Sequence, residues 1–583
     1  MSPSSTRFIA LNATGFLGLL TAVLRRDGVY LIDVGNGMPM LRPIWRRIGA
    51  FLIRFGWVAP VHAAFPADQR YFVESWMPEH PNLFWSLESD IARRFDFGRF
   101  ESLPGYTQAL RHAACTYAHH KLRQVSLLHR LSRQYGNGVS VHGIDLPVLD
   151  WHNAAFGVPR CHVRALDTAG ALRAAVVYLA IVFYAAAWLL RRVRRTATNA
   201  APVLLGLDFT QDVRHTALVR AVLDREADAL FVFRNRGQQA AAVGWPEMAG
   251  FASVYPEDIV VSPREAMTLW SVVVADGWRI LRLCRQLPAE LFFEAIKLPL
   301  RRIIFRGFFA RHPVRYFLSK DDYNPEHAVR SDELRRAGAV SLGISHGMPT
   351  PGIVDPAVRY IDFDIYFTFG RYPYPEHYHD TWPRRMKTVA VGSYGMTPAQ
   401  LQRLSPPRPP DIVCFLSRLV GEHEMYAEVQ RLARAFPDRT VFVKAKYRPG
   451  GPYHFDYGAL GGDPPNIVHT WDSPYELMLR CRYAVSNGSS TVAAEAIQFG
   501  LATWVLDSFD AETKFFYRHF SDLCVRSAGE VIGRIRALES GQDTYRHDLF
   551  KDLINLSGRP IHGMIREHLN LAPKHDRLPV AAQ

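Results

Sequence analysis

The sequence predicts an α/β protein in which two parallel-sheet domains face a cleft, with an additional region on the N-terminal side. Short apolar strand-like runs alternate with helical stretches from about residue 200 onward, the pattern of parallel sheets with crossover helices. A proline-rich segment at 406–410 divides this series in two. The 583 residues are enough for two or three domains.

The first α/β series lies within 199–405. Its order is strand, loop, helix, strand, and a long helical stretch interrupts it at 263–310. Ligands in such sheets bind at the carboxyl ends of the strands, so polar residues that follow strands are candidates for a site. We expect strands at 203–207, 229–233, 315–318, 340–344, 365–369 and 388–391.

The second series lies within 411–570, directly after the proline-rich linker. Two such domains on either side of a proline hinge form an open cleft. We expect strands at 412–416, 440–444, 467–469, 483–485 and 503–506, with helices at 422–435, 473–480 and 491–499.

The N-terminal region, 1–170, contains one recognisable strand at 29–34 and indicates no function. It is followed by a predicted membrane-associated helix at 171–198, in which the apolar run 174–190 precedes four arginines in five residues. Three interpretations stay open for this run: a membrane span with the arginine end in the cytoplasm, a helix lying in the plane of the membrane, or a buried core helix. A second segment, 291–315, is either an interfacial helix with a basic rim or an ordinary amphipathic helix.

The formal charge of +14 suggests a nucleic acid, an anionic membrane surface or a phosphorylated substrate as partner. Nucleic acid is the weakest of the three, because the sequence contains no zinc-finger spacing, helix-turn-helix pattern or paired RNA-binding aromatics. The six cysteines include no CxxC pair and indicate free thiols in a reducing compartment.

The strongest local signal is a strand at 483–485 that runs into a Gly/Ser turn and then a helix. Backbone N–H groups and hydroxyls in such a turn converge on one point and form a phosphate cradle. The alternative is a plain helix cap formed by a serine hydroxyl. The predicted binding residues are Ser486, Asn487, Gly488, Ser489, Ser490, Thr491 and Glu495.

Basic residues follow earlier strands of the same domain. Lys444, Lys446 and Arg448 end one strand, and Ser417 and Arg418 end another. A cluster of this kind opposite a phosphate cradle suits a nucleotide mono- or diphosphate. A solvated strand end is the alternative interpretation.

These motifs resemble the donor domain of bacterial surface-polysaccharide GT-B glycosyltransferases. The similar families are the capsule and lipopolysaccharide Kdo transferases, the sialyltransferase-like proteins and the CDP-glycerol glycerophosphotransferases. The resemblance covers about 200–530 and rests on Ser489-Ser490, Glu495-Ala496 and the basic-Pro element Arg448-Pro449, where these families usually have His-Pro. The strand-end sequence Ser345-His346-Gly347 is similar to their His-Gly element.

The resemblance implies a GT-B-like fold of two Rossmann-type domains, an acceptor domain at 199–405 and a donor domain at 411–570. The donor would be a CMP- or UDP-linked sugar and the acceptor a lipid-linked or polysaccharide chain, at the cytoplasmic face of the inner membrane. The rivals are a CDP-glycerol-type phosphotransferase, a sugar-nucleotide 2-epimerase and an inert membrane scaffold of a polysaccharide assembly complex.

Catalysis by such an enzyme needs positioning, stabilisation of the departing phosphate and, for inversion, a base on the acceptor hydroxyl. Candidate carboxylates at strand ends are Asp208, Asp212, Asp321 and Asp322, although a strand-end aspartate is often a helix cap. His346 is a candidate base or phosphate contact, or a loop histidine. No Asp-x-Asp motif lies at an expected strand end, so we expect no metal and no cofactor besides the nucleotide-sugar substrate.

Overall fold

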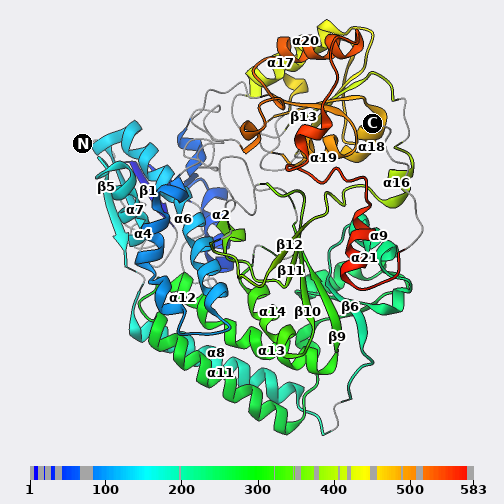
Figure 1. Cartoon of the computed structure of the whole chain (residues 1–583). Coiled ribbons are helices and arrows are strands. Elements are labelled where there is room, and N and C mark those ends of the chain that lie inside the picture. Colours follow the sequence, from blue (N-terminus) through cyan, green and yellow to red (C-terminus); the bar gives the residue numbers. More distant parts are fainter. Residues whose placement is uncertain are drawn as a thin grey trace.

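The structure is a computed structural model of the chain (Figure 1). It describes residues 6–10, 19, 28–32, 42–65, 83–167, 169–195, 198–320, 322, 324–345, 347, 356–372, 378, 380–404, 408–416, 422–446, 456–487, 490–506 and 516–573. The statements below concern these residues.

The N-terminal region is itself a parallel α/β domain. Its sheet has the strand order β3-β2-β1-β4-β5, and every neighbouring pair is parallel. Of these strands, sequence analysis had recognised β2 alone. The strands are β1 (Thr6–Ala10), β2 (Val29–Ile32), β3 (Ala59–Pro60), β4 (Val139–Asp145) and β5 (His162–Leu166), and the helices are α2 (Arg42–Arg54), α4 (Leu83–Arg94), α5 (Phe97–Phe100), α6 (Thr107–Tyr135) and α7 (Leu146–Phe156).

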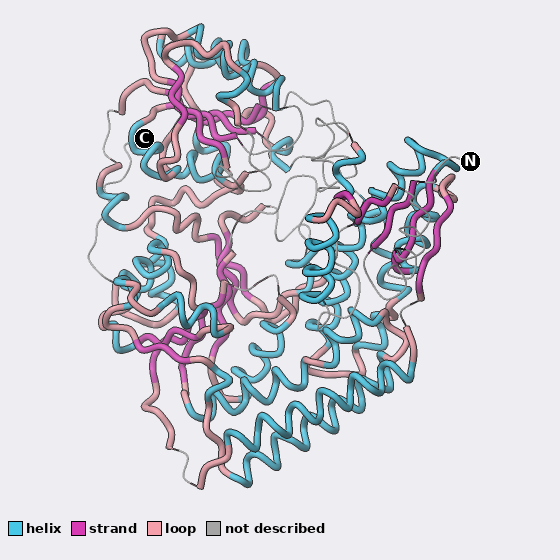
Figure 2. The backbone as a smooth tube through the Cα atoms, turned by 180° about the vertical axis from the view of Figure 1, so that it is seen from behind, coloured by secondary structure: helices cyan, strands magenta, loops and turns pink. Residues whose placement is uncertain are grey.

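A layer of helices connects this domain to the next. The helix α8 (Ala171–Arg192) leads out of the N-terminal domain and packs along α11 (Pro263–Cys284), followed by α12 (Ala289–Ile296) and α13 (Leu298–Arg311). Buried side chains of α8 and of α11 to α13 belong to the same apolar cluster as the core of the N-terminal domain. Both views show α8 and α11 side by side along one edge of the molecule (Figures 1 and 2).

The middle domain contains a seven-stranded parallel sheet of order β12-β11-β10-β9-β6-β7-β8. All six predicted strands are confirmed, each end lying within two residues of its predicted position. The strands are β6 (Val203–Asp208), β7 (Ala229–Val232), β8 (Ala252–Val254), β9 (Val314–Ser319), β10 (Val340–Ile344), β11 (Ile365–Thr368) and β12 (Lys387–Ala390), and the helices α9 (Val213–Val222), α10 (Arg236–Ala242), α14 (Glu326–Arg336) and α16 (Pro398–Gln402).

The C-terminal domain contains a six-stranded parallel sheet of order β15-β14-β13-β16-β17-β18. The strands β13, β16 and β17 are buried throughout, as expected where helices cover both faces of a parallel sheet. The strands are β13 (Ile412–Leu416), β14 (Val441–Ala445), β15 (Ile467–His469), β16 (Tyr483–Asn487), β17 (Ala502–Leu506) and β18 (Cys524–Val525), and the helices α17 (Glu422–Ala435), α18 (Pro474–Arg480), α19 (Val492–Gln498) and α20 (Ala528–Glu539).

The three sheets share one topology. In each, the first strand lies between the second and the fourth of its domain, so the connections diverge at that point to opposite faces of the sheet. Such a switch point is where doubly wound sheets bind ligands. The predicted α/β fold with two facing Rossmann-type domains, the GT-B-like arrangement, is confirmed, and a third parallel domain precedes them.

The last helix, α21 (Ile561–His568), returns to the middle domain. Its buried Ile561 and Ile565 join the apolar cluster beneath β6 and β9. Arg566, 2% exposed, donates to the Val222 carbonyl at 2.6 Å and to Asp224 at 3.0 Å. In Figure 1, α21 lies beside α9. The C-terminal segment therefore ties the two facing domains together.

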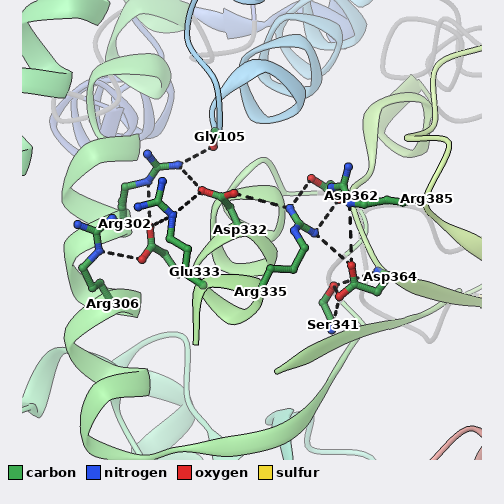
Figure 3. A network of polar contacts seen from close by, with 11 residues as sticks. Gly105, Arg302, Arg306, Asp332, Glu333, Arg335, Ser341, Asp362, Asp364 and Arg385 are labelled. Carbon is green, nitrogen blue, oxygen red and sulfur yellow. Dashed lines mark hydrogen bonds and ion pairs between the residues drawn. The ribbon is translucent and has the colours of Figure 1, made fainter. Parts of the chain in front are cut away.

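The interfacial-helix interpretation of 291–315 is wrong. Within α13, ten residues are buried, among them Arg302. Arg302 contacts Asp332 at 2.8 Å and Glu333 at 3.2 Å, and Arg306 contacts Glu333 at 2.8 Å (Figure 3). These arginines are compensated within the protein, which is the ordinary amphipathic-helix alternative.

Candidate functional site

The switch points of the middle and C-terminal domains face each other across a polar network. Arg214, in the first turn of α9, donates to the Tyr475 hydroxyl at 2.9 Å. That hydroxyl donates to Glu495 of α19 at 2.9 Å. Ser393, which follows β12, donates to the same carboxylate oxygen at 2.5 Å. One chain of hydrogen bonds thus joins α9 and the segment after β12 to the helices α18 and α19 of the C-terminal domain.

Glu495 is the centre of this network. It is buried, and burial raises the pKa of its carboxyl, although the hydrogen bonds from Ser393 and Tyr475 oppose that shift. The sequence predicted Glu495 as a nucleotide contact. The structure places it between the two domains, where it accepts from Ser393 of the middle domain and from Tyr475 of the C-terminal domain. Glu495 therefore fixes how the domains dock, and its role as a nucleotide contact stays a prediction.

Two cations stand at the switch point of the middle domain. Arg214 donates to both carboxylate oxygens of Asp212, at 2.9 and 2.7 Å. Lys320, the residue after β9, lies 3.7 Å from Asp212 and 5.0 Å from the centre of the Tyr394 ring. Burial lowers the pKa of Lys320, and Asp212 opposes that shift.

Arg214 and Lys320 are not among the residues predicted from the sequence, because the candidates expected at the strand ends of this domain are carboxylates and a histidine. The signal for Lys320 was present, since it lies two residues after the predicted strand 315–318, at the same sheet edge as Asp208 and Asp212. Arg214 had no comparable signal, because Tyr475 lies 261 residues away in the sequence.

The predicted cradle lies at the switch point of the C-terminal domain. Ser486 and Asn487 are the last, buried residues of β16. The Ser490 hydroxyl accepts from the Val492 backbone N–H at 3.4 Å, and the Ser490 carbonyl accepts from Tyr517 at 2.7 Å. The Ser490 hydroxyl is thus bonded to the first residue of α19, whose N-cap position is held by Thr491. The turn follows β16, which pairs with β13 at the switch point. Gly488 and Ser489 lie outside the described residues.

The segment 345–347 meets this turn from the opposite domain. Ser345, at the end of β10, is buried and donates to the Gly347 carbonyl at 2.5 Å. A Cβ atom at Gly347 would lie 3.4 Å from the Thr491 hydroxyl. Two of the segments predicted from sequence, from different domains, are thus in contact. His346 itself lies outside the described residues.

The described aspartates proposed as catalytic have protein partners. Asp208 is 1% exposed and accepts from Arg330 at 2.7 Å and Ser319 at 2.6 Å. Burial alone would raise its pKa, but Arg330, Arg234 and Ser319 hold the pKa of Asp208 below its usual value. Asp322 is 1% exposed and accepts from Tyr366 at 2.6 Å. Both geometries favour a structural role. Asp321 lies outside the described residues.

The predicted basic cluster is described in part. Lys444 belongs to β14, next to β13, and donates to the Ala445 carbonyl at 3.1 Å. Its ammonium group lies 5.4 Å from the centre of the Trp471 ring. Lys446 follows at the same carboxyl edge, where its backbone N–H donates to Leu416 at 2.8 Å. Ser417, Arg418 and Arg448 lie outside the described residues.

Within the described part of the chain, no group of three or more His, Cys, Asp or Glu side chains is placed to hold a metal ion. The expectation that no metal is required stays a prediction.

A buried histidine beside the site predicts a pH dependence of stability. His215 is 1% exposed, and neither ring nitrogen has a hydrogen-bond partner. Burial lowers the pKa of His215 to about 4. The unfolded chain, with a histidine pKa of about 6.5, binds this proton first, so stability is complete above pH ~6.5 and falls as the pH drops toward ~4.

We expect His215→Leu to reduce the loss of unfolding free energy between pH 7 and pH 5 by about 2 kcal/mol. Urea unfolding of both proteins at the two pH values measures this difference. Equal losses in the two proteins would mean that the imidazole of His215 is hydrated in the native state.

No protein-family model matches the sequence, and no curated protein matches it. Solved structures with similar regions include UDP-GlcNAc 2-epimerase from Neisseria meningitidis bound to UDP-GlcNAc (10% identity, TM-score 0.39, covering 64% of this chain and 100% of that one). They also include the wall teichoic acid polymerase TagF (10% identity, TM-score 0.39, covering 69% of this chain and 96% of that one). A third is Acinetobacter baumannii MurG (9% identity, TM-score 0.35, covering 64% of this chain and 99% of that one). TM-scores below 0.5 are too low to support a function, and the architecture rests on the strand orders above.

Proposed function

We propose that the chain is a nucleotide-sugar-dependent glycosyltransferase. It would take a CMP- or UDP-linked sugar and transfer it to a lipid-linked or polysaccharide acceptor in bacterial cell-surface polysaccharide synthesis, at the cytoplasmic face of the inner membrane. The observation that carries the proposal is the pair of facing switch points joined by Arg214, Tyr475 and Glu495.

The side chains at the two facing switch points fit such a donor. The turn at 486–491 would receive the nucleotide phosphates at the switch point of the C-terminal sheet, with Lys444 on the neighbouring strand edge. Lys320 and Arg214 would contribute positive charge from the opposite domain. Fixed cations next to a departing phosphate stabilise the charge that develops on it in the transition state.

Binding of a nucleotide tests this proposal first. We expect one of CMP, CDP, UDP, GDP or a CMP-sugar to raise the melting temperature of the full chain, because a ligand at 100 times its Kd stabilises by about 2.7 kcal/mol. The variant Ser489→Ala/Ser490→Ala should lose this shift. The matched control is Ser540→Ala, since that hydroxyl lies at the exposed end of α20 and donates to Ala537.

Absence of any shift would contradict a nucleotide-dependent enzyme and favour the scaffold alternative. A shift that survives the double variant would place the nucleotide elsewhere. If a nucleotide binds, the product separates the remaining rivals: a new glycosidic bond supports the proposal, whereas a new phosphodiester or an epimerised donor overturns it.

A further inference from the structure

The outer face of α8 is apolar from Val176 to Leu190. Phe183 is 70% exposed and Leu190 is 75% exposed, and the solvent-facing positions between Val176 and Leu190 include no charged side chain. The adjacent helix α11 adds Met267, 65% exposed, and the partly exposed Trp270 and Trp278. Exposed apolar side chains gathered on two adjacent helices mark an interaction surface. We call this set of side chains the apolar band.

The inner face of α8 is fixed to the protein. The Tyr178 hydroxyl donates to the Val274 carbonyl at 3.1 Å, and the Trp188 indole donates to the Glu257 carbonyl at 3.1 Å. Beyond the helix, the Arg194 N–H donates to the Val261 carbonyl at 3.0 Å. Among the described helices, α8 is long and apolar enough to cross a membrane, but crossing alone would break these contacts with α11 and with the segment before it.

Arginines flank the apolar band at both ends. The contacts of Tyr178 with Val274 and of Arg194 with Val261 show that α8 and α11 are antiparallel. One end of the pair therefore exposes Arg173, Arg279, Arg282 and Arg285, and the other exposes Arg191, Arg194, Arg195 and Arg264.

Little acidic charge opposes these arginines on the two helices. The helix α8 has no acidic residue, and α11 has two. Glu265 is paired with Arg311, and Asp276 accepts from Tyr106 at 2.7 Å and lies 3.5 Å from Arg302. The exposed face of the pair is thus uncharged and mostly apolar in the middle, with Thr268 and Ser271 as its polar exceptions on α11, and basic at its ends.

We propose that α8 and α11 together dock flat on an anionic lipid bilayer, with the apolar band at the acyl boundary and the terminal arginines among the headgroups. Apolar faces with basic rims and interfacial tryptophans bind membranes in this way. A second copy of the chain fits poorly, because pairing the two faces in either direction brings arginine ends together. A span would have to carry one arginine-rich end through the hydrocarbon.

This inference rests on the proposed function in one respect: it assigns the membrane surface named there to particular helices. Vesicle binding and nucleotide binding are measured separately, so the failure of one is distinguishable from the failure of the other.

Vesicle flotation of the full chain tests the docking face. We expect binding to vesicles that contain phosphatidylglycerol, and little binding to phosphatidylcholine alone or at high salt. Arg282→Gln/Arg285→Gln should weaken binding about 30-fold, since each arginine near an anionic surface contributes about fivefold. Leu179→Glu/Phe183→Glu should abolish binding, while the control Val243→Glu, at a residue 81% exposed on another domain, should leave it unchanged.

Probe depth distinguishes lying flat from spanning. A polarity-sensitive fluorophore on Val176→Cys and on Leu190→Cys, in a Cys524→Ser background because the other five cysteines are buried, should report the same shallow depth. Four results would each overturn the proposal. The chain could fail to bind anionic vesicles, or bind them equally well with Leu179→Glu/Phe183→Glu. The two fluorophores could lie at unequal depths, or the chain could form a dimer in solution that the two glutamates dissociate.

Discussion

Replacing Lys121 by methionine is expected to lower the free energy of unfolding by about 3–5 kcal/mol. Its side chain is 2% exposed and lies 2.8 Å from Asp145 and 2.9 Å from Glu290. Without the ammonium group, both buried carboxylates lose the cation that lies within 3 Å of each. Lys121 lies on α6, Asp145 ends β4 and Glu290 lies on α12, so the cluster joins the N-terminal domain to the helical layer. Denaturant unfolding of the full chain measures the loss.

The triple variant Lys121→Met/Asp145→Asn/Glu290→Gln is the control. It removes all three charges with little change of volume, and we expect it to recover most of the lost stability, as for other buried ion clusters replaced as a set. If Lys121→Met alone stays within about 1 kcal/mol of the wild type, the cluster behaves like a solvent-exposed ion pair and the described burial is contradicted.

Asp208→Asn is expected to cost about 3–5 kcal/mol, again because it leaves a buried cation without its partner. Arg330 is 6% exposed and donates to Asp208 at 2.7 and 3.2 Å. Unfolding free energies of Asp208→Asn and of Asp208→Asn/Arg330→Met test this, since the double variant should be the more stable of the two.

The same pair of variants separates a structural role from a catalytic one. A structural Asp208 predicts that nucleotide binding returns together with stability in the double variant. A stable Asp208→Asn protein that binds nucleotide but transfers no sugar would instead support the catalytic assignment of this carboxylate.

Sequence reasoning located the strands of the two facing domains well, because four or five apolar residues between turn signals are distinctive. The predicted 467–469 has the same limits as β15. The N-terminal sheet was not predicted from the sequence, because β3 has two residues and β4 contains the polar residues Ser140 and His142. The 29-residue α6 also precedes β4, which hides the strand-helix alternation.

The candidate site was predictable in part. The turn at 486–491 and Glu495 could be found, because a strand, a Gly/Ser turn and a helix follow one another in sequence. The donors to Glu495 could not, because Ser393 lies 102 residues away and meets it through the docking of two domains. The burial of the candidate aspartates was also not predictable from the sequence. An aspartate at a strand end has the same sequence signal whether it faces a ligand or, like Asp208, an arginine.

The central claim is that the nucleotide binds between the middle and C-terminal domains. Each of the three described sheets has a switch point that could hold a ligand. Hydrogen exchange of the full chain, with and without the nucleotide that binds it, tests the claim most directly because it shows which switch point is protected. The proposed function predicts slower exchange at 486–495 and, across the cleft, at 209–214, with 6–10 and 139–145 unchanged. Protection confined to the N-terminal domain, or to one side of the cleft with none at 486–495, would contradict a donor site between the middle and C-terminal domains.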